Sequence, residues 1–96
     1  MPDRRDALIA AVAAHNRSHR PLPNSAVRVL EAMFAGDDVC QQSVEALEEV
    51  AGLSRKSVQK GLRALLAAGV IAKEGTGAGR HPSRYRLLLT LGGGAR

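Results

Sequence analysis

The chain contains few aromatic residues, a single cysteine and no long apolar run. Phe34 and Tyr85 are the only phenylalanine and tyrosine among 96 residues and tryptophan is absent, so a hydrophobic core has to be aliphatic. Cys40 is the sole cysteine, which excludes an internal disulfide bond. No stretch approaches the roughly 20 apolar residues of a membrane-spanning helix, and residues 7–14 are too short and irregular for a secretion signal. We therefore expect one small domain in the cytoplasm, with no membrane contact.

The basic residues are concentrated in the second half of the chain. The net charge is +5, but residues 3–52 carry five arginines and eight carboxylates, which leaves a local charge of −3. Residues 53–86 carry eight basic residues and one glutamate, a local charge of +7. This segregation favours a polyanionic partner for the second half. The alternative is a solvated basic surface that has no partner.

Helical spacing of apolar residues, together with capping residues, predicts four helices. Their expected ranges are 3–15, 24–35, 44–51 and 54–68. The second helix is expected to begin at an N-cap formed by Asn24 or Ser25. The polar connector before it contains Pro21 and Pro23, so we expect residues 1–20 to form an N-terminal helix and connector outside the main domain, residues 21–91.

The third and fourth helices are expected to be joined by a very short turn. Ser43 and Ser54 are their predicted N-caps, and Gly52 is the predicted C-terminal stop of the third helix. Because only Leu53 lies between that stop and the next cap, the two helices should cross at a steep angle. Gly61 interrupts the fourth helix, and we expect it to face the second or third helix closely, since a mid-helix glycine otherwise costs about 1 kcal/mol.

The fourth helix has one apolar and one basic face. The apolar positions follow helical spacing and are Val58, Leu62, Leu65 and Leu66. The other side carries Arg55, Lys56, Gln59, Lys60 and Arg63. This helix therefore offers a row of cationic and amide groups to a polyanion.

Short strands are predicted around the glycine-rich second half. Residues 39–41, 70–73 and 84–91 are the candidates, and Tyr85, Leu87, Leu89 and Leu91 alternate onto one face of the last. Residues 75–83 form a glycine-rich basic loop between the last two strands, which predicts a β-hairpin with an extended wing. Residues 92–96 are expected to be a flexible tail.

This order of elements resembles winged helix-turn-helix domains, a mainly α fold with a small β-hairpin and the order α-α-β-α-α-β-β. The resemblance covers residues 22–89 and is carried by residues 43–47, 52–54 and 69–71, by Val58, Leu62 and Leu65, and by Ser83-Arg84-Tyr85-Arg86-Leu87. Together these residues look most similar to the winged domains of plasmid and phage replication proteins and of GntR- and MarR-type bacterial regulators. The family usually has a small alanine where this chain has Glu48. We therefore expect either a rotated third helix or a Glu48 side chain that reaches the edge and meets an arginine.

The resemblance implies sequence-specific binding of double-stranded DNA, with the fourth helix in the major groove and the basic wing beside it. Arg55, Lys56, Gln59 and Lys60 match positions that enter the groove, and Arg63 lies one turn further along. Phosphate contacts are implied for the helix starts and the hairpin, namely at Ser43, Ser54, Ser57, Arg84 and Arg86. At the wing, Arg80 is expected in a minor groove or along the backbone, with His81 beside it. The implied process is transcriptional regulation, or control of plasmid or phage replication or partition.

The alternatives to DNA binding are a protein-interaction module and an enzyme. A winged domain can instead bind proteins without direct DNA contact, and the acidic first half would suit a basic partner. No catalytic constellation or nucleotide loop is present, so we expect neither an enzyme nor a cofactor. His15 and His19 are four residues apart but lack further ligands, so no metal site is expected, and Cys40 is expected to be a core residue.

A homodimer is expected because one such domain contacts few base pairs. The first helix carries a narrow apolar stripe formed by Leu8, Ile9 and Val12, which is the candidate interface. The alternative is that the stripe covers the core of its own chain.

Overall fold

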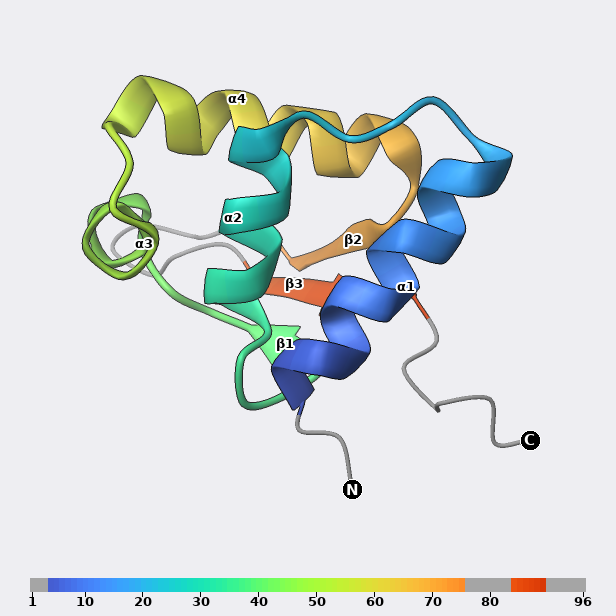
Figure 1. Ribbon diagram of the computed structural model, residues 1–96. Coiled ribbons are helices and arrows are strands. Elements are labelled where there is room, and N and C mark those ends of the chain that lie inside the picture. The colour runs from blue at the N-terminus through green and yellow to red at the C-terminus, as the bar shows by residue number, and fades with distance from the viewer. Residues whose placement is uncertain (1–3, 76–83, 90–96) are drawn as a thin grey trace.

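The computed structural model describes residues 4–75 and 84–89, which form a mainly helical fold with a small antiparallel sheet (Figure 1). Within these residues the elements are α1 (Arg4–Ser18), α2 (Asn24–Met33), β1 (Val39–Cys40), α3 (Val44–Ala51), α4 (Arg55–Ala68), β2 (Ile71–Gly75) and β3 (Arg84–Leu87). Their order is the one that the sequence predicts. Of the predicted wing, residues 75–83, only Gly75 is described, and it is the last residue of β2 rather than part of a loop. Residues 76–83 and the predicted tail lie outside the described residues. None of the described helices is long and apolar enough to cross a membrane.

The predicted turn between α3 and α4 is confirmed in detail. The Ser43 hydroxyl accepts a hydrogen bond from the Ala46 backbone N–H at 3.1 Å, and Ser54 caps α4 in the same way through the Ser57 N–H at 3.2 Å. Gly52 ends α3 with φ of 68°, in the left-handed region where a glycine is preferred. Figure 1 shows the resulting steep crossing, with α3 seen nearly end-on and α4 running across the view.

The boundaries of the first two helices differ from those predicted. The expected N-cap at Asn24 or Ser25 is wrong, because Asn24 is already helical and Pro23 takes the capping position without a side-chain hydrogen bond. Proline suits the start of a helix, where its missing N–H has no intrahelical partner to lose. Helix α1 continues to Ser18, beyond the predicted end at residue 15. Pro21 is the first residue after α1 that is disfavoured inside a helix, because proline has no backbone N–H and its ring clashes with the preceding turn.

Helix α2 lies at the centre of the core. It buries Val29 and Leu30 completely, and Phe34, just beyond its end, is also fully buried. The other helices and the sheet pack around it and bury Leu47 of α3 and Leu65 of α4. A Cβ atom on Gly61 of α4 would lie 2.9 Å from the Val29 Cγ2 atom, which confirms the expectation that this glycine faces the second helix closely.

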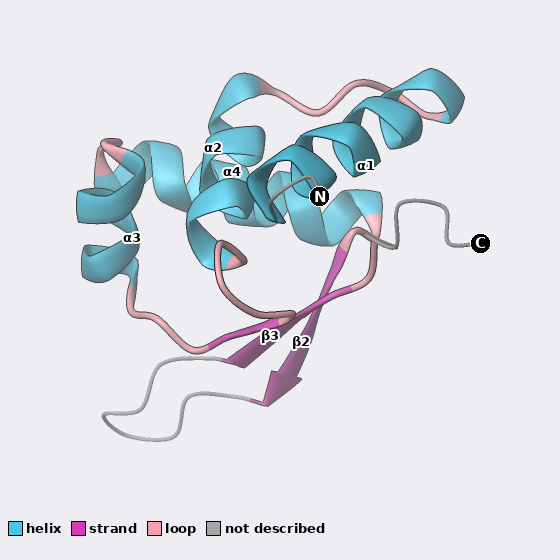
Figure 2. Ribbon diagram, turned by 60° about the horizontal axis from the view of Figure 1, so that its bottom comes forward, coloured by secondary structure: helices cyan, strands magenta, loops and turns pink. Residues whose placement is uncertain are grey.

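The three strands form one antiparallel sheet in the order β1-β3-β2. The sequence predicts β2 and β3 as neighbours, but it does not predict that β1 pairs with β3, with Cys40 opposite Tyr85. The expected alternation holds over β3, where Tyr85 is half-buried and Leu87 is buried while Arg84 and Arg86 are exposed. The strand ends at Leu87, before the predicted end at residue 91, since Leu88 and Leu89 are not part of it. Figure 2 shows the sheet on one side of the helices, with β2 and β3 extending away from them.

The apolar stripe of α1 packs into the core of its own chain. Leu8 is 0% exposed and Val12 is 6% exposed, so the expected dimer interface is wrong for these two residues. Of the stripe, only Ile9 is on the surface, at 45% exposure. At the start of α1, the Arg4 side chain donates hydrogen bonds to the Phe34 carbonyl oxygen and to the Asp38 carboxylate.

Glu48 is half-buried at the edge of α3. Its backbone carbonyl accepts the Gly52 N–H at 2.9 Å and so takes part in the cap of the helix. Within residues 4–75 and 84–89 no ion pair joins the Glu48 side chain to an arginine, so the expected contact with an arginine is not found there. Partial exposure avoids the cost of a buried, unpaired carboxylate.

Candidate nucleic-acid interface

Helix α4 presents on one exposed face the four side chains that the sequence predicts for groove contact, together with Arg63 one turn further along. They are Arg55, Lys56, Gln59, Lys60 and Arg63, and all are exposed. At 100° per residue they span an arc of roughly 140°. The opposite side of the helix buries Val58 and Leu65 against the core, and this packing fixes which way the basic arc faces.

The serine hydroxyls at the helix starts are engaged as caps. Ser43 caps α3 and is exposed, while Ser54 donates to the half-buried Ser57 hydroxyl at 3.1 Å. The hydroxyls of Ser43 and Ser57 each keep a hydrogen that is not used within the described residues. The starts of α3 and α4 also carry backbone N–H groups and the positive end of the helix dipole, so both starts can accept an anion.

Arg55 forms an ion pair with Glu45 in the first turn of α3. The Arg55 Nη2 atom lies 3.3 Å from the Glu45 Oε1 atom, and the two side chains are 62% and 77% exposed. An ion pair this open contributes at most about 1 kcal/mol. Arg55 is therefore held in place by a weak partner that a phosphate can replace.

Arg84 and Arg86, for which phosphate contact is predicted, share a carboxylate within the sheet. Glu74 of β2 lies 3.7 Å from the Arg84 Nε atom and 2.5 Å from the Arg86 Nε atom. The hydrogen bond from Arg86, with the charges of both arginines, holds the Glu74 pKa below its usual value. Glu74 neutralises one of the two positive charges, so the group of Arg84, Arg86 and Glu74 keeps a net charge of +1.

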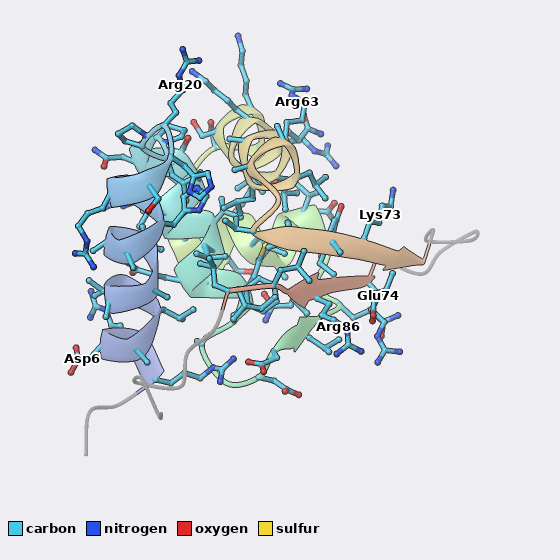
Figure 3. The ribbon with its side chains drawn as sticks, turned by 90° about the vertical axis from the view of Figure 1, so that its right-hand side faces the viewer. Asp6, Arg20, Arg63, Lys73, Glu74 and Arg86 are labelled. Atoms are coloured by element: carbon cyan, nitrogen blue, oxygen red, sulfur yellow. The ribbon has the colours of Figure 1, made fainter. Side chains whose placement is uncertain are left out.

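Two exposed basic residues beside α4 were not singled out by the sequence. Lys73 of β2 is exposed and lies on the same face of the sheet as its partner Tyr85, and Figure 3 shows its side chain on the opposite side of the strand from Glu74 and Arg86. Arg20 belongs to the connector, which packs against Ala64, Ala67 and Ala68 of α4 around a cleft of about 490 Å³. Figure 3 places Arg20 and Arg63 at the same end of the molecule. No local motif identifies either residue, because both positions depend on how distant segments pack.

The predicted wing residues Arg80 and His81 lie outside the described residues. The described residues contain no group of three or more side chains able to hold a metal ion. The rings of His15 and His19 stack with their centroids 4.4 Å apart. Cys40 is a core residue, as predicted, and burial raises the pKa of its thiol.

No known protein family matches the chain, and no curated protein is significantly similar to it. The function is therefore inferred from the residues and their arrangement.

Proposed function

We propose that the chain is a winged helix-turn-helix domain that binds double-stranded DNA in a sequence-specific way. The observation that carries the proposal is the exposed arc of α4, where Arg55, Lys56, Gln59, Lys60 and Arg63 lie together on a helix anchored by its apolar side. An α-helix with side chains is about 10–12 Å wide, which matches the major groove of B-DNA at about 12 Å. The fold supplies such a helix at the surface with its cationic face outward.

The geometry of the α3–α4 turn supports this function. Both helices begin with exposed capped ends, at Ser43 and Ser54, and the tight turn through Gly52 brings α3 across α4. In this arrangement α4 enters the groove while the start of α3 contacts the adjacent phosphates. Ser57 adds a hydroxyl donor on the first turn of α4.

Each side chain on the arc has a distinct chemical role. Arg55 and the lysines Lys56 and Lys60 bind guanine edges or phosphates, and Gln59 pairs with an adenine edge through its amide. Arg63 contacts the backbone one turn further along. On the sheet side, Arg84 and Arg86 bind phosphate, and the wing residues Arg80 and His81 reach the minor groove or the backbone.

The proposed process is transcriptional regulation, or control of plasmid or phage replication or partition, by a cytoplasmic homodimer. The same class of domain occurs in the replication proteins and in the GntR- and MarR-type regulators that the sequence resembles. Selection of bound duplexes from a random pool tests the proposal and separates these roles. An enriched palindrome supports a two-fold dimer at an operator, and tandem repeats support an origin. Recovery of no preferred sequence would refute specific recognition.

A protein-interaction module is the second candidate. Two observations favour it: Glu45 and Glu74 each partly neutralise the basic surface, and Val50 exposes an apolar side chain on α3. This alternative predicts that the chain binds no duplex at low ionic strength but still captures a protein partner. Duplex binding that weakens steeply as salt is added would exclude it as the main function, because counterion release accompanies each phosphate contact.

A further inference from the structure

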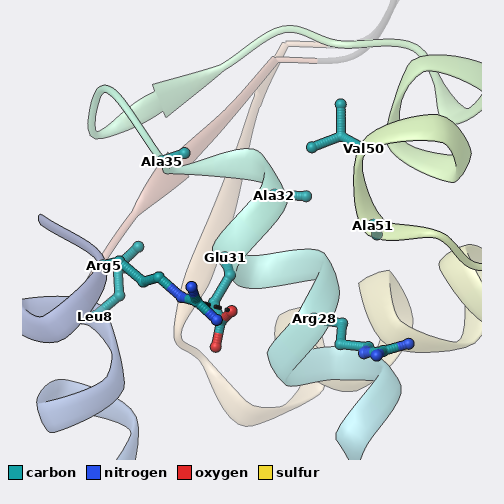
Figure 4. Close-up of a pocket in the computed structure, with 8 residues that line it drawn as sticks. All are labelled: Arg5, Leu8, Arg28, Glu31, Ala32, Ala35, Val50 and Ala51. Atoms are coloured by element: carbon teal, nitrogen blue, oxygen red, sulfur yellow. Dashed lines mark ion pairs between the residues drawn. The ribbon is translucent and has the colours of Figure 1, made fainter.

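An apolar hollow of about 260 Å³ lies between α1, α2 and α3, away from the proposed DNA surface. Its apolar lining is formed by Leu8 of α1, Ala32 of α2, Ala35 just beyond α2, and Val50 and Ala51 of α3 (Figure 4). A water molecule takes about 30 Å³ in the liquid, so the volume of the hollow is that of several water molecules. This is enough room for one branched aliphatic side chain. The small alanine side chains let another helix approach closely.

Val50 projects from the same surface that contains the hollow. Its side chain is 61% exposed, the most exposed of the large apolar residues among those described. A surface that combines an apolar projection with an adjacent apolar hollow is self-complementary. This is the requirement for a two-fold contact, in which each copy offers the same patch to the other.

Charges around the hollow also favour a second copy of the chain. On the α1 and α2 side, Arg5 is paired with Glu31 at 3.8 Å, and Arg28 has no ion-pair partner among the described residues. On the α3 side, Glu49 precedes Val50, is exposed and likewise lacks an ion-pair partner in the part of the chain that the structure describes. A two-fold contact that places α3 of one copy against α2 of the other brings Glu49 to the partner's Arg28.

The hollow leaves the proposed DNA surface free. Helix α2 uses different sides for the hollow and for α4. At 100° per residue, the α2 residues that line the hollow point in a direction roughly 110° away from the α2 residues that contact Gly61. A copy bound in the hollow therefore does not cover the basic arc. Two such chains would present two α4 helices to DNA at once.

We propose that this hollow is the contact between two copies of the chain, with Val50 of each copy inserted into the hollow of the other and Glu49 paired with Arg28. The proposal assigns a surface to the homodimer named under the proposed function, in place of the buried Leu8 and Val12. It does not depend on whether the dimer binds DNA.

The test is the molar mass of the intact chain, measured by sedimentation equilibrium across a wide range of concentrations. Wild type is expected to approach twice the chain mass of 10.1 kDa. Val50→Glu is expected to weaken dimerisation by about tenfold or more, since it places a charge in the centre of an apolar contact. The matched control is Ile9→Glu, which adds the same charge at an exposed apolar position outside the hollow and should leave dimerisation unchanged.

A charge exchange gives a second test that does not depend on the apolar contact. Arg28→Glu and Glu49→Arg are each expected to weaken the dimer, and the double variant is expected to recover it. A wild-type chain that stays monomeric, or a dimer that Ile9→Glu disrupts and Val50→Glu does not, would overturn the proposal. A monomer that still binds duplex DNA would refute this interface while leaving the proposed DNA binding intact.

Discussion

A Cβ atom on Gly61 would lie 2.9 Å from the backbone carbonyl oxygen of Ser25, which places α4 in direct contact with the backbone of α2. A contact this short leaves no room for any side chain at position 61. The glycine therefore sets how closely the two helices approach, and this approach holds the basic arc of α4 outward.

Gly61→Ala is expected to destabilise the fold by about 1–3 kcal/mol, because overpacking against Ser25 and Val29 outweighs the gain of about 1 kcal/mol in helix propensity. Urea unfolding measures the change. Gly36→Ala is the matched control, since a Cβ atom there meets nothing within 4 Å. A Gly61→Ala variant more stable than wild type would show that the helices do not pack this closely.

Glu45→Gln is expected to strengthen duplex binding by roughly twofold to fivefold, because it frees Arg55 from an ion pair worth at most about 1 kcal/mol. Fluorescence anisotropy with a labelled duplex measures the change. Asp37→Asn removes one negative charge from an exposed loop and serves as the control for net charge. Equal gains in the two variants would mean that Glu45 acts only through overall charge.

The Glu74 carboxyl predicts a pH dependence of stability. Its pKa in the folded chain lies below its usual value, so its ionised form is favoured by folding. The stabilisation is therefore present above the unfolded pKa and is lost as the pH falls through the folded value. We expect wild type to lose more stability than Glu74→Gln on acidification below about pH 4.3, the usual Glu value.

Unfolding by urea across this pH range measures both chains. If the free energy of unfolding falls equally with pH in wild type and in Glu74→Gln, the pairing of Glu74 with Arg84 and Arg86 would be contradicted.

Local signals in the sequence predict the elements well. Ser43, Gly52 and Ser54 define the turn between α3 and α4 because capping depends on residues only a few positions apart. The helical spacing on α4 likewise predicts which of its side chains are exposed, except that Leu66, predicted on the apolar stripe, is 37% exposed. These features are governed by the backbone of one short segment.

Long-range relationships could not be predicted in the same way. The pairing of β1 with β3 and the burial of Leu8 and Val12 depend on how distant segments pack. The ion pairs of Arg55 with Glu45 and of Arg86 with Glu74 join residues ten and twelve positions apart on different elements. No sequence spacing encodes such contacts, so the partial neutralisation of the candidate interface emerges only from the fold.

Recognition of bases in duplex DNA by α4 is the core of the proposed function. Its most direct test is the affinity of Gln59→Ala for the duplex selected from a random pool, compared with a scrambled duplex at the same ionic strength. We predict a loss of about 1–3 kcal/mol on the selected duplex and almost none on the scrambled one. Equal affinity of wild type and variant for both duplexes would contradict base recognition by this helix.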